Sequence, residues 1–125
     1  MKKSSLVSKI KSVLEKEKAV IFVYIYGSIL TDKHYRDIDI AVYAAQEPDP
    51  LALSANLTVA LSKKTGIPPD NFDVRVINGV RDPTFLKRVL QGKLLIDKDF
   101  DERGDFIEAF SMRYRESEGI LAEAF

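Results

Sequence analysis

Apolar residues recur along this chain at two spacings, and each spacing predicts one kind of element. A continuous apolar run from Val20 to Tyr26, rich in β-branched residues, is too short to favour a helix and predicts a strand buried on both faces. Alternation of apolar and polar residues predicts strands at 37–43 and 72–77, and a short apolar piece at 94–96 predicts an edge strand.

Apolar residues spaced three or four apart predict helices around these strands. The first expected helix runs from Ser4 or Ser5, either of which can cap it, to about Lys16. The other three run from Pro50 to just before Gly66, from Asp82-Pro83 to Gly92, and from about Glu102 to the end. The apolar stripes of the first three are Leu6, Val7, Ile10, Val13 and Leu14; Leu53, Leu57, Ala60 and Leu61; and Phe85, Leu86, Val89 and Leu90. In the last helix Phe106, Phe110, Tyr114, Ser117 and Leu121 recur every three or four residues.

This order of elements predicts a small α/β or α+β fold, a short mixed sheet flanked by helices. With 125 residues, the chain is expected to form a single domain, 1–125, around one core. Lys plus Arg and Asp plus Glu balance at 19 each, so the whole-chain charge gives no reason to expect nucleic acid or a membrane as the main partner. The chain has no cysteine and a single histidine, His34, which excludes thiol chemistry and a histidine-based zinc site.

The N-terminus has the lysines of a signal peptide but not its apolar segment. Met1-Lys-Lys is followed by apolar residues at helical spacing, not by a continuous apolar run, so no export signal is expected. No segment approaches the ~20 apolar residues that span a bilayer. We therefore expect a cytoplasmic protein.

Two carboxylates open the second predicted strand. Residues two apart in a strand point to the same side, so Asp37 and Asp39 share one face while Ile38 and Ile40 face the core. The like charges repel each other and resist burial, and a divalent cation would offset them. A pair of this kind is equally typical of a solvated strand end.

Two further features lie near strand ends. Gly27-Ser28 stops the first strand, allows a sharp turn, and leaves N–H groups and a hydroxyl that could hold a phosphate if a helical turn begins there. Asp73 begins the third strand on the face opposite Phe72 and Val74; if that strand neighbours the second, three carboxylates could bind one or two Mg²⁺ ions. Taken singly, the first also fits a plain turn glycine and the second a turn aspartate.

The loop between Ser28 and the carboxylate pair carries Lys33, His34 and Arg36. These cationic or potentially cationic side chains would lie where a triphosphate needs balancing charge. Each of them alone is more typical of a solvated loop.

Together, Gly27-Ser28, Asp37-x-Asp39 and Asp73 resemble the nucleotidyltransferase superfamily that includes DNA polymerase beta. More closely, the chain is similar to the minimal nucleotidyltransferases (MNT) of prokaryotes, and the similarity extends over nearly its whole length. Two features depart from that family. Only eight residues separate Ser28 from Asp37, and Ile29-Leu30 stands where relatives often carry Arg.

The resemblance implies a reaction. Asp37, Asp39 and Asp73 would hold one or two Mg²⁺ ions and act in catalysis, while Gly27, Ser28, Lys33 and Arg36 would bind the phosphates of ATP or another nucleoside triphosphate. A nucleoside monophosphate, AMP in the first instance, would pass to an acceptor hydroxyl, and Asp73 would guide the attack.

In the minimal family the partner is a small helical HEPN-type toxin, modified with AMP on a tyrosine, so the resemblance implies an antitoxin role. The C-terminal helix offers apolar residues for such a partner or for self-association, although ordinary packing on the sheet is expected for most of them. They are Phe106, Phe110, Met112, Tyr114 and Phe125.

Two other functions remain open from the sequence. One is a non-catalytic module that keeps the fold, binds a nucleotide and neutralises its partner by masking it. The other is a nucleotidyltransferase for small molecules, although that group generally adds a helical region for its acceptor and this chain is short for it.

Overall fold

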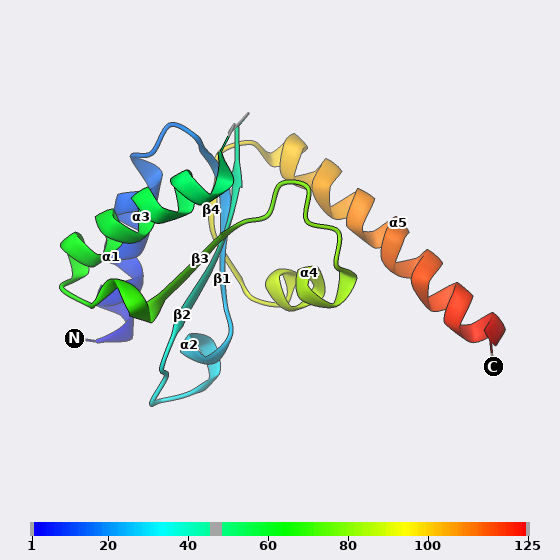
Figure 1. Cartoon of the computed structure of the whole chain (residues 1–125), viewed down its shortest axis with the longest axis horizontal. Helices are drawn as coiled ribbons and strands as arrows, with labels where there is room; N and C mark the ends of the chain where they lie inside the picture. Colours follow the sequence, from blue (N-terminus) through cyan, green and yellow to red (C-terminus); the bar gives the residue numbers. More distant parts are fainter. Residues whose placement is uncertain (1, 46–48, 125) are drawn as a thin grey trace.

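The computed structural model describes residues 2–45 and 49–124, with side chains up to residue 116. Its described part contains a four-stranded sheet in the order β3-β2-β1-β4 (Figure 1). The strands are β1 (Val20–Tyr26), β2 (Ile38–Ala44), β3 (Phe72–Val76) and β4 (Lys93–Asp97). The helices are α1 (Lys3–Glu15), α2 (Ser28–Thr31), α3 (Pro50–Thr65), α4 (Pro83–Leu90) and α5 (Phe100–Ala124), with a short 3₁₀ turn, η1 (Pro69–Asn71).

The sheet is mixed, as the sequence predicts. Strand β1 pairs antiparallel with both β2 and β4, whereas β2 pairs in parallel with β3. A parallel pair needs a crossover connection, and α3 supplies it. Strand β4 lies at one edge, where it is expected, and β3 lies at the other.

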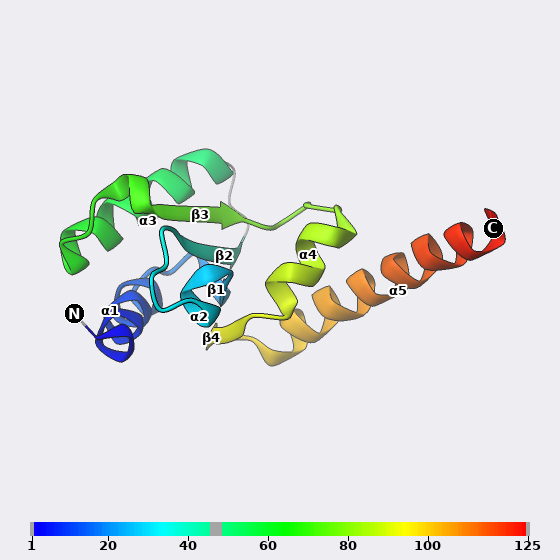
Figure 2. The ribbon, with the colours of Figure 1, turned by 90° about the horizontal axis from the view of Figure 1, so that it is seen from below.

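The helices cover the sheet on both faces. Figure 1 shows α1 and α3 on one side and α4 and α5 on the other. Each face has its own apolar core: Ile10, Leu14 and Leu57 pack on the first, and Phe22, Leu86 and Val89 pack on the second. Seen from below in Figure 2, α5 continues well beyond the sheet, away from α1 and α3.

Caps fix the starts of α3 and α4; the cap of α4 was predicted, whereas that of α3 was not. The side chain of Asp49 accepts hydrogen bonds from the backbone N–H groups of residues 51 and 52, both at 3.1 Å. Asp82 accepts from Thr84 at 3.0 Å and from Phe85 at 3.4 Å, with Pro83 at the first helical position. The cap expected for the first helix is wrong: α1 begins at Lys3 after Lys2, which makes no side-chain cap bond.

Several boundaries differ from the expectation by a residue or two. Strand β2 begins at Ile38, so Asp37 precedes it, β3 ends at Val76, and α5 begins at Phe100. Helix α2 and turn η1 were not predicted as definite elements, because four residues or fewer cannot show a helical period.

The first part of the apolar stripe of α5 packs on the sheet. The ring of Phe106 lies 5.6 Å from Phe22 and 5.4 Å from Tyr43, centroid to centroid, and Phe110 is buried beside Tyr114. Met112 is 55% exposed. The side chains of Ser117 and Leu121, which belong to the predicted helical spacing, and Phe125, which is among the residues expected to face a partner, lie outside the described residues.

Within the described parts of the chain, no helix combines the length and the apolar character needed to cross a membrane.

Candidate functional site

The parallel pairing of β2 and β3 brings two of the predicted carboxylates together. Asp39 stands directly opposite Asp73 in the register, one residue after the pair Ile38 and Phe72. The apolar neighbours are buried in the core beneath α1 and α3, so both carboxylates face the other side of the sheet, towards α4. The third strand does neighbour the second, which is the condition on which the grouping of the carboxylates depended.

The third carboxylate, Asp37, is exposed just before β2. Its charge nevertheless acts on Asp39, whose pKa is raised by burial first, then by the charges of Asp73 and Asp37. The guanidinium groups of Arg88 and Arg75 oppose part of this shift. The site is therefore a region of concentrated negative charge that favours cations.

Gly27 joins this carboxylate cluster to α2. It follows Tyr26, the residue of β1 that pairs with Asp39, and has a φ of 82° and a ψ of −153°. Glycine alone adopts this conformation readily. A Cβ at Gly27 would also collide with Oδ2 of Asp39, so the backbone passes directly over that carboxylate.

Helix α2 begins immediately after Gly27. The amide of Leu30 donates to the carbonyl of Gly27 at 3.1 Å, and that of Asp32 donates to the carbonyl of Ser28 at 2.8 Å. Ile29 is buried in the core and anchors the turn. Gly27-Ser28 thus lies beside Asp39, as the sequence pattern implies, and a helical turn does begin at Ser28.

The loop from α2 to β2 is tied to the rest of the fold through its backbone. Lys3 donates to the carbonyl of Asp32 at 2.5 Å, and the side-chain amide of Asn71 donates to the carbonyl of Arg36 at 3.0 Å. The side chains of Lys33, His34 and Arg36 are exposed.

Two residues of the site that the sequence analysis did not select are Arg75 and Phe85. Nε of Arg75 lies 3.3 Å from Oδ1 of Asp73, and its Nη2 lies 3.4 Å from Oδ2. The guanidinium also lies over the ring of Phe85, 5.1 Å from its centroid. Arg75 could have been found from the period of two that places it on the face of Asp73, whereas Phe85 has only the signature of a core residue.

Tyr26 is a third such residue. Its side chain is buried against α4, with its ring 6.0 Å from that of Phe85, edge to face. Burial, with the nearby charges of Asp39 and Asp73, raises the pKa of the Tyr26 hydroxyl to about 12. Tyr26 stands within an uninterrupted apolar run, so its pattern in the sequence is that of a core residue.

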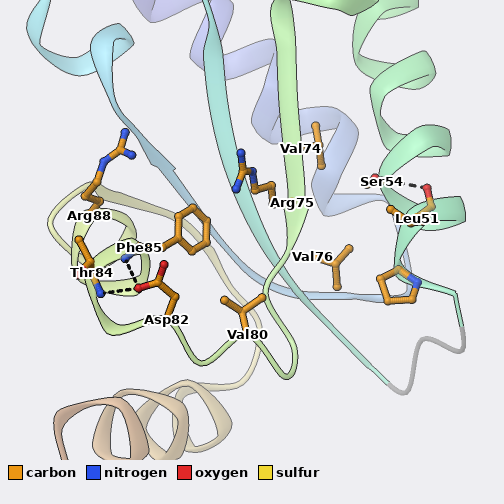
Figure 3. A pocket seen from close by; sticks show the side chains of 11 residues that line it. Leu51, Ser54, Val74, Arg75, Val76, Val80, Asp82, Thr84, Phe85 and Arg88 are labelled. Carbon is orange, nitrogen blue, oxygen red and sulfur yellow. Dashed lines mark hydrogen bonds between the residues drawn. The ribbon is translucent and has the colours of Figure 1, made fainter. Parts of the chain in front are cut away.

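A cavity of about 620 Å³ opens next to Arg75, between β3, the start of α3 and α4 (Figure 3). Phe85, Arg88 and Asp82 line it from α4 and its cap, and Leu51 and Ser54 line it from α3. A smaller hollow of about 260 Å³ lies beside Gly27 and Thr31 and shares Arg88 with the larger one. Helix α4 therefore forms a wall of both hollows.

The donors suit a hard divalent cation such as Mg²⁺, since they are carboxylates and their mutual repulsion calls for positive charge. In the arrangement seen here, no group of three or more His, Cys, Asp or Glu side chains stands close enough to hold an ion within the described residues. Asp73 instead contacts Arg75. The chemistry fits, and Asp73 would have to exchange its partner when an ion binds.

Solved structures with the same fold include three toxin–antitoxin complexes. One is the tri-AMPylated HEPN toxin of Shewanella oneidensis in complex with MNT antitoxin, 22% identical, with a TM-score of 0.66 and 98% of both chains covered. A second is a toxin–antitoxin with AMP-PNP, 23% identical, with a TM-score of 0.67 over 94% of this chain and 97% of that one. A third is a mutant MntA–HpeT toxin–antitoxin, 19% identical, with a TM-score of 0.65 over 99% and 98%.

At these identities the likeness concerns the fold. No curated protein matches the sequence. The family model "Polymerase beta, Nucleotidyltransferase" matches residues 8–101, which is three quarters of the chain. The matched range includes Gly27, Asp39 and Asp73. Fold, site geometry and sequence agree, and the chain belongs to the polymerase beta-type nucleotidyltransferase family.

Proposed function

We propose that this protein transfers a nucleoside monophosphate, AMP from ATP, to an acceptor hydroxyl. The observation that carries the proposal is the meeting of Asp39 and Asp73 across β2 and β3, with Gly27 packed directly against Asp39. Paired carboxylates beside a glycine-bounded turn provide a place for cations and phosphates together.

In this proposal Asp37, Asp39 and Asp73 would hold one or two Mg²⁺ ions, which would supply positive charge against the phosphates and would make the acceptor hydroxyl more acidic. The other proposed contacts come from the chain around them. Gly27 and Ser28 bind the phosphates, and Lys33 and Arg36 reach them from their exposed positions in the following loop.

The transfer replaces a phosphoanhydride bond of ATP with a phosphodiester bond to the acceptor. The acceptor oxygen forms a bond to the α-phosphorus of ATP while the bond from that phosphorus to the bridging oxygen breaks. Pyrophosphate leaves, and the hydroxyl proton is released. Asp73 orients the acceptor for this in-line attack, so the residues act by positioning and by charge, with no covalent intermediate on the protein.

The acceptor is proposed to enter through the 620 Å³ cavity. This cavity lies along β3, on the flank of the carboxylates away from Gly27, because β2 separates β3 from β1 in the sheet. A phosphate chain at Gly27 and an acceptor at β3 would then approach Asp39 and Asp73 from opposite sides. That arrangement is what an in-line displacement needs.

For the acceptor we propose a tyrosine of a small helical HEPN-type toxin, with this chain as its antitoxin. The structural relatives support this: one is a complex that contains an AMPylated HEPN toxin, and another contains AMP-PNP. Residues 1–125 would act as one nucleotidyltransferase domain, in the cytoplasm, where ATP is available.

Label transfer tests the proposal. The chain is co-expressed with the protein encoded beside it, and the complex is incubated with Mg²⁺ and ATP labelled at the α-phosphate. Label is expected on the partner protein, and it should be lost with Asp37→Asn or Asp39→Asn. A complex that forms normally but takes up no label would overturn the enzymatic proposal in favour of a masking module; label found only on small molecules would overturn the protein acceptor.

A further inference from the structure

Asp73 and Arg75 form an ion pair inside the candidate site. They lie two residues apart on the same face of β3, and two nitrogens of the guanidinium approach the two carboxylate oxygens at 3.3 and 3.4 Å. Asp39 stands directly opposite Asp73. The guanidinium therefore neutralises the carboxylate that faces Asp39 across the two strands, a carboxylate that a bound cation would also use.

A second contact holds Arg75 in this position. Its guanidinium lies 5.1 Å from the ring centroid of Phe85, and Phe85 in turn packs edge to face on Tyr26 at 6.0 Å. Tyr26 is 2% exposed and pairs with Asp39 in the sheet. The aromatic pair thus gives the guanidinium a second contact next to the carboxylates, separate from the ion pair.

The ion pair itself can open at little cost. The side chain of Arg75 is 56% exposed and that of Asp73 is 43% exposed, and pairs this accessible to water are weak. Since Mg²⁺ carries twice the charge of a guanidinium and prefers carboxylate oxygens, it can replace Arg75 on Asp73.

We propose that Arg75 is the built-in counter-ion of the site and exchanges with the divalent cation on Asp73. The inference rests on the proposed function, because it takes Asp73 as a cation ligand. Before the cation binds, Arg75 offsets the repulsion between Asp73 and Asp39. Afterwards the guanidinium stays on Phe85, at the wall of the cavity that it already lines. Arg75 is therefore a positioning residue that sets how tightly the site takes its cation.

Binding of Mn²⁺ alone tests this without any transfer reaction. The full chain is titrated with Mn²⁺ at constant ionic strength, without nucleotide, and free Mn²⁺ is read from its electron paramagnetic resonance signal. Arg75→Gln removes the competitor and should lower the Kd about two- to fivefold, the range expected for an exposed ion pair. Arg81→Gln removes the same charge from an exposed position before α4 and should leave the Kd unchanged.

A double-mutant cycle makes the test specific to Asp73. In an Asp73→Asn background, which lacks the partner, Arg75→Gln should no longer tighten binding. Equal affinity of wild type and Arg75→Gln, or a gain that persists fully without Asp73, would overturn the proposal. Failure of the proposed metal site looks different: Mn²⁺ binding would then be absent in the wild type or unaffected by Asp39→Asn.

Discussion

At the scale of single residues, Gly27 has the most demanding position. Its φ of 82° with ψ of −153° suits glycine alone, and any Cβ would meet the Asp39 carboxylate. Gly27→Ala should therefore lower the free energy of unfolding by about 2 kcal/mol, within the range of about 1–3 kcal/mol for such backbone strain. Urea denaturation at pH 7 measures it.

Gly66→Ala is the matched control. Gly66 also has a positive φ, 76°, but nothing lies within 4 Å of its Cβ position. The variant should lower the free energy of unfolding only by the cost of a left-handed residue, about 1 kcal/mol, and it should keep nucleotidyl transfer. Equal losses of stability and activity in the two variants would show that the Asp39 contact is irrelevant.

Asp39 is expected to destabilise the folded chain and to be needed for the transfer reaction. Its raised pKa reflects burial and like charges, so its ionised form is unfavourable in the folded state. Asp39→Asn should raise the free energy of unfolding at pH 7 by roughly 0.5 kcal/mol, since like charges directly opposite on neighbouring strands destabilise a sheet. The same variant should lose transfer. A variant that is both less stable and still active would contradict the role given to Asp39.

Tyr26 gives the stability of the folded chain a measurable pH dependence. Its pKa is about 12 in the folded chain, against about 10 in an unfolded one. The folded state therefore holds the hydroxyl proton more tightly than the unfolded state does. The contribution of this group to the free energy of unfolding is complete below pH ~10 and is lost as the pH rises towards ~12.

Unfolding free energies at pH 8 and pH 11 test this shift. Between pH ~8 and ~11, the free energy of unfolding of the wild type should fall by about 1.4 kcal/mol more than that of Tyr26→Phe. The comparison cancels groups that titrate in both proteins. Identical pH profiles for the two would show that the Tyr26 hydroxyl is not perturbed.

At this scale, the sequence spacing was sufficient for some residues and not for others. Asp39 and Asp73 could be predicted because period two assigns each to a face of its own strand. Phe85 belongs to the site only through contacts between elements, from α4 to Arg75 on β3 and to Tyr26 on β1. Spacing within one element carries no information about such a contact.

At the scale of elements, the pairing of β2 with β3 decides the site. The sequence predicts both strands but not that they are neighbours, because parallel strands joined by a helix have no turn signal to fix their register. The alternation of Phe72 and Val74 against Asp73 then places the carboxylate correctly once β3 lies beside β2. Helix α2 escaped prediction since it is only four residues long.

Helix α5 makes a prediction of its own. Phe106 packs on the rings of Phe22 and Tyr43, whereas Met112 is mostly exposed on the same helix. Phe106→Ala should lower the free energy of unfolding by about 2 kcal/mol, somewhat below a fully buried phenylalanine. Met112→Ala should change it by no more than about 0.5 kcal/mol. Chemical denaturation of the two variants compares them; a similar cost for both would contradict the packing of α5 on the sheet.

At the scale of the whole molecule, the paired carboxylates lie on the face of the sheet that α4 covers. Helices α1 and α3 pack on the other face, while α4 stands beside the two hollows that share Arg88 (Figures 1 and 3). Positive and negative side chains balance over the whole chain, so in the proposed reaction local charged groups, not a general field of the protein, would attract the nucleotide and its acceptor.

Intact-mass spectrometry of the partner protein measures the transfer most directly. The purified partner encoded beside this chain is incubated with the chain, ATP and Mg²⁺, and its mass is compared with that after incubation with Asp39→Asn. We predict that the partner gains the mass of one or more AMP groups with wild type and none with the variant. A partner that binds both proteins equally well and keeps its unmodified mass with wild type would contradict nucleotidyl transfer.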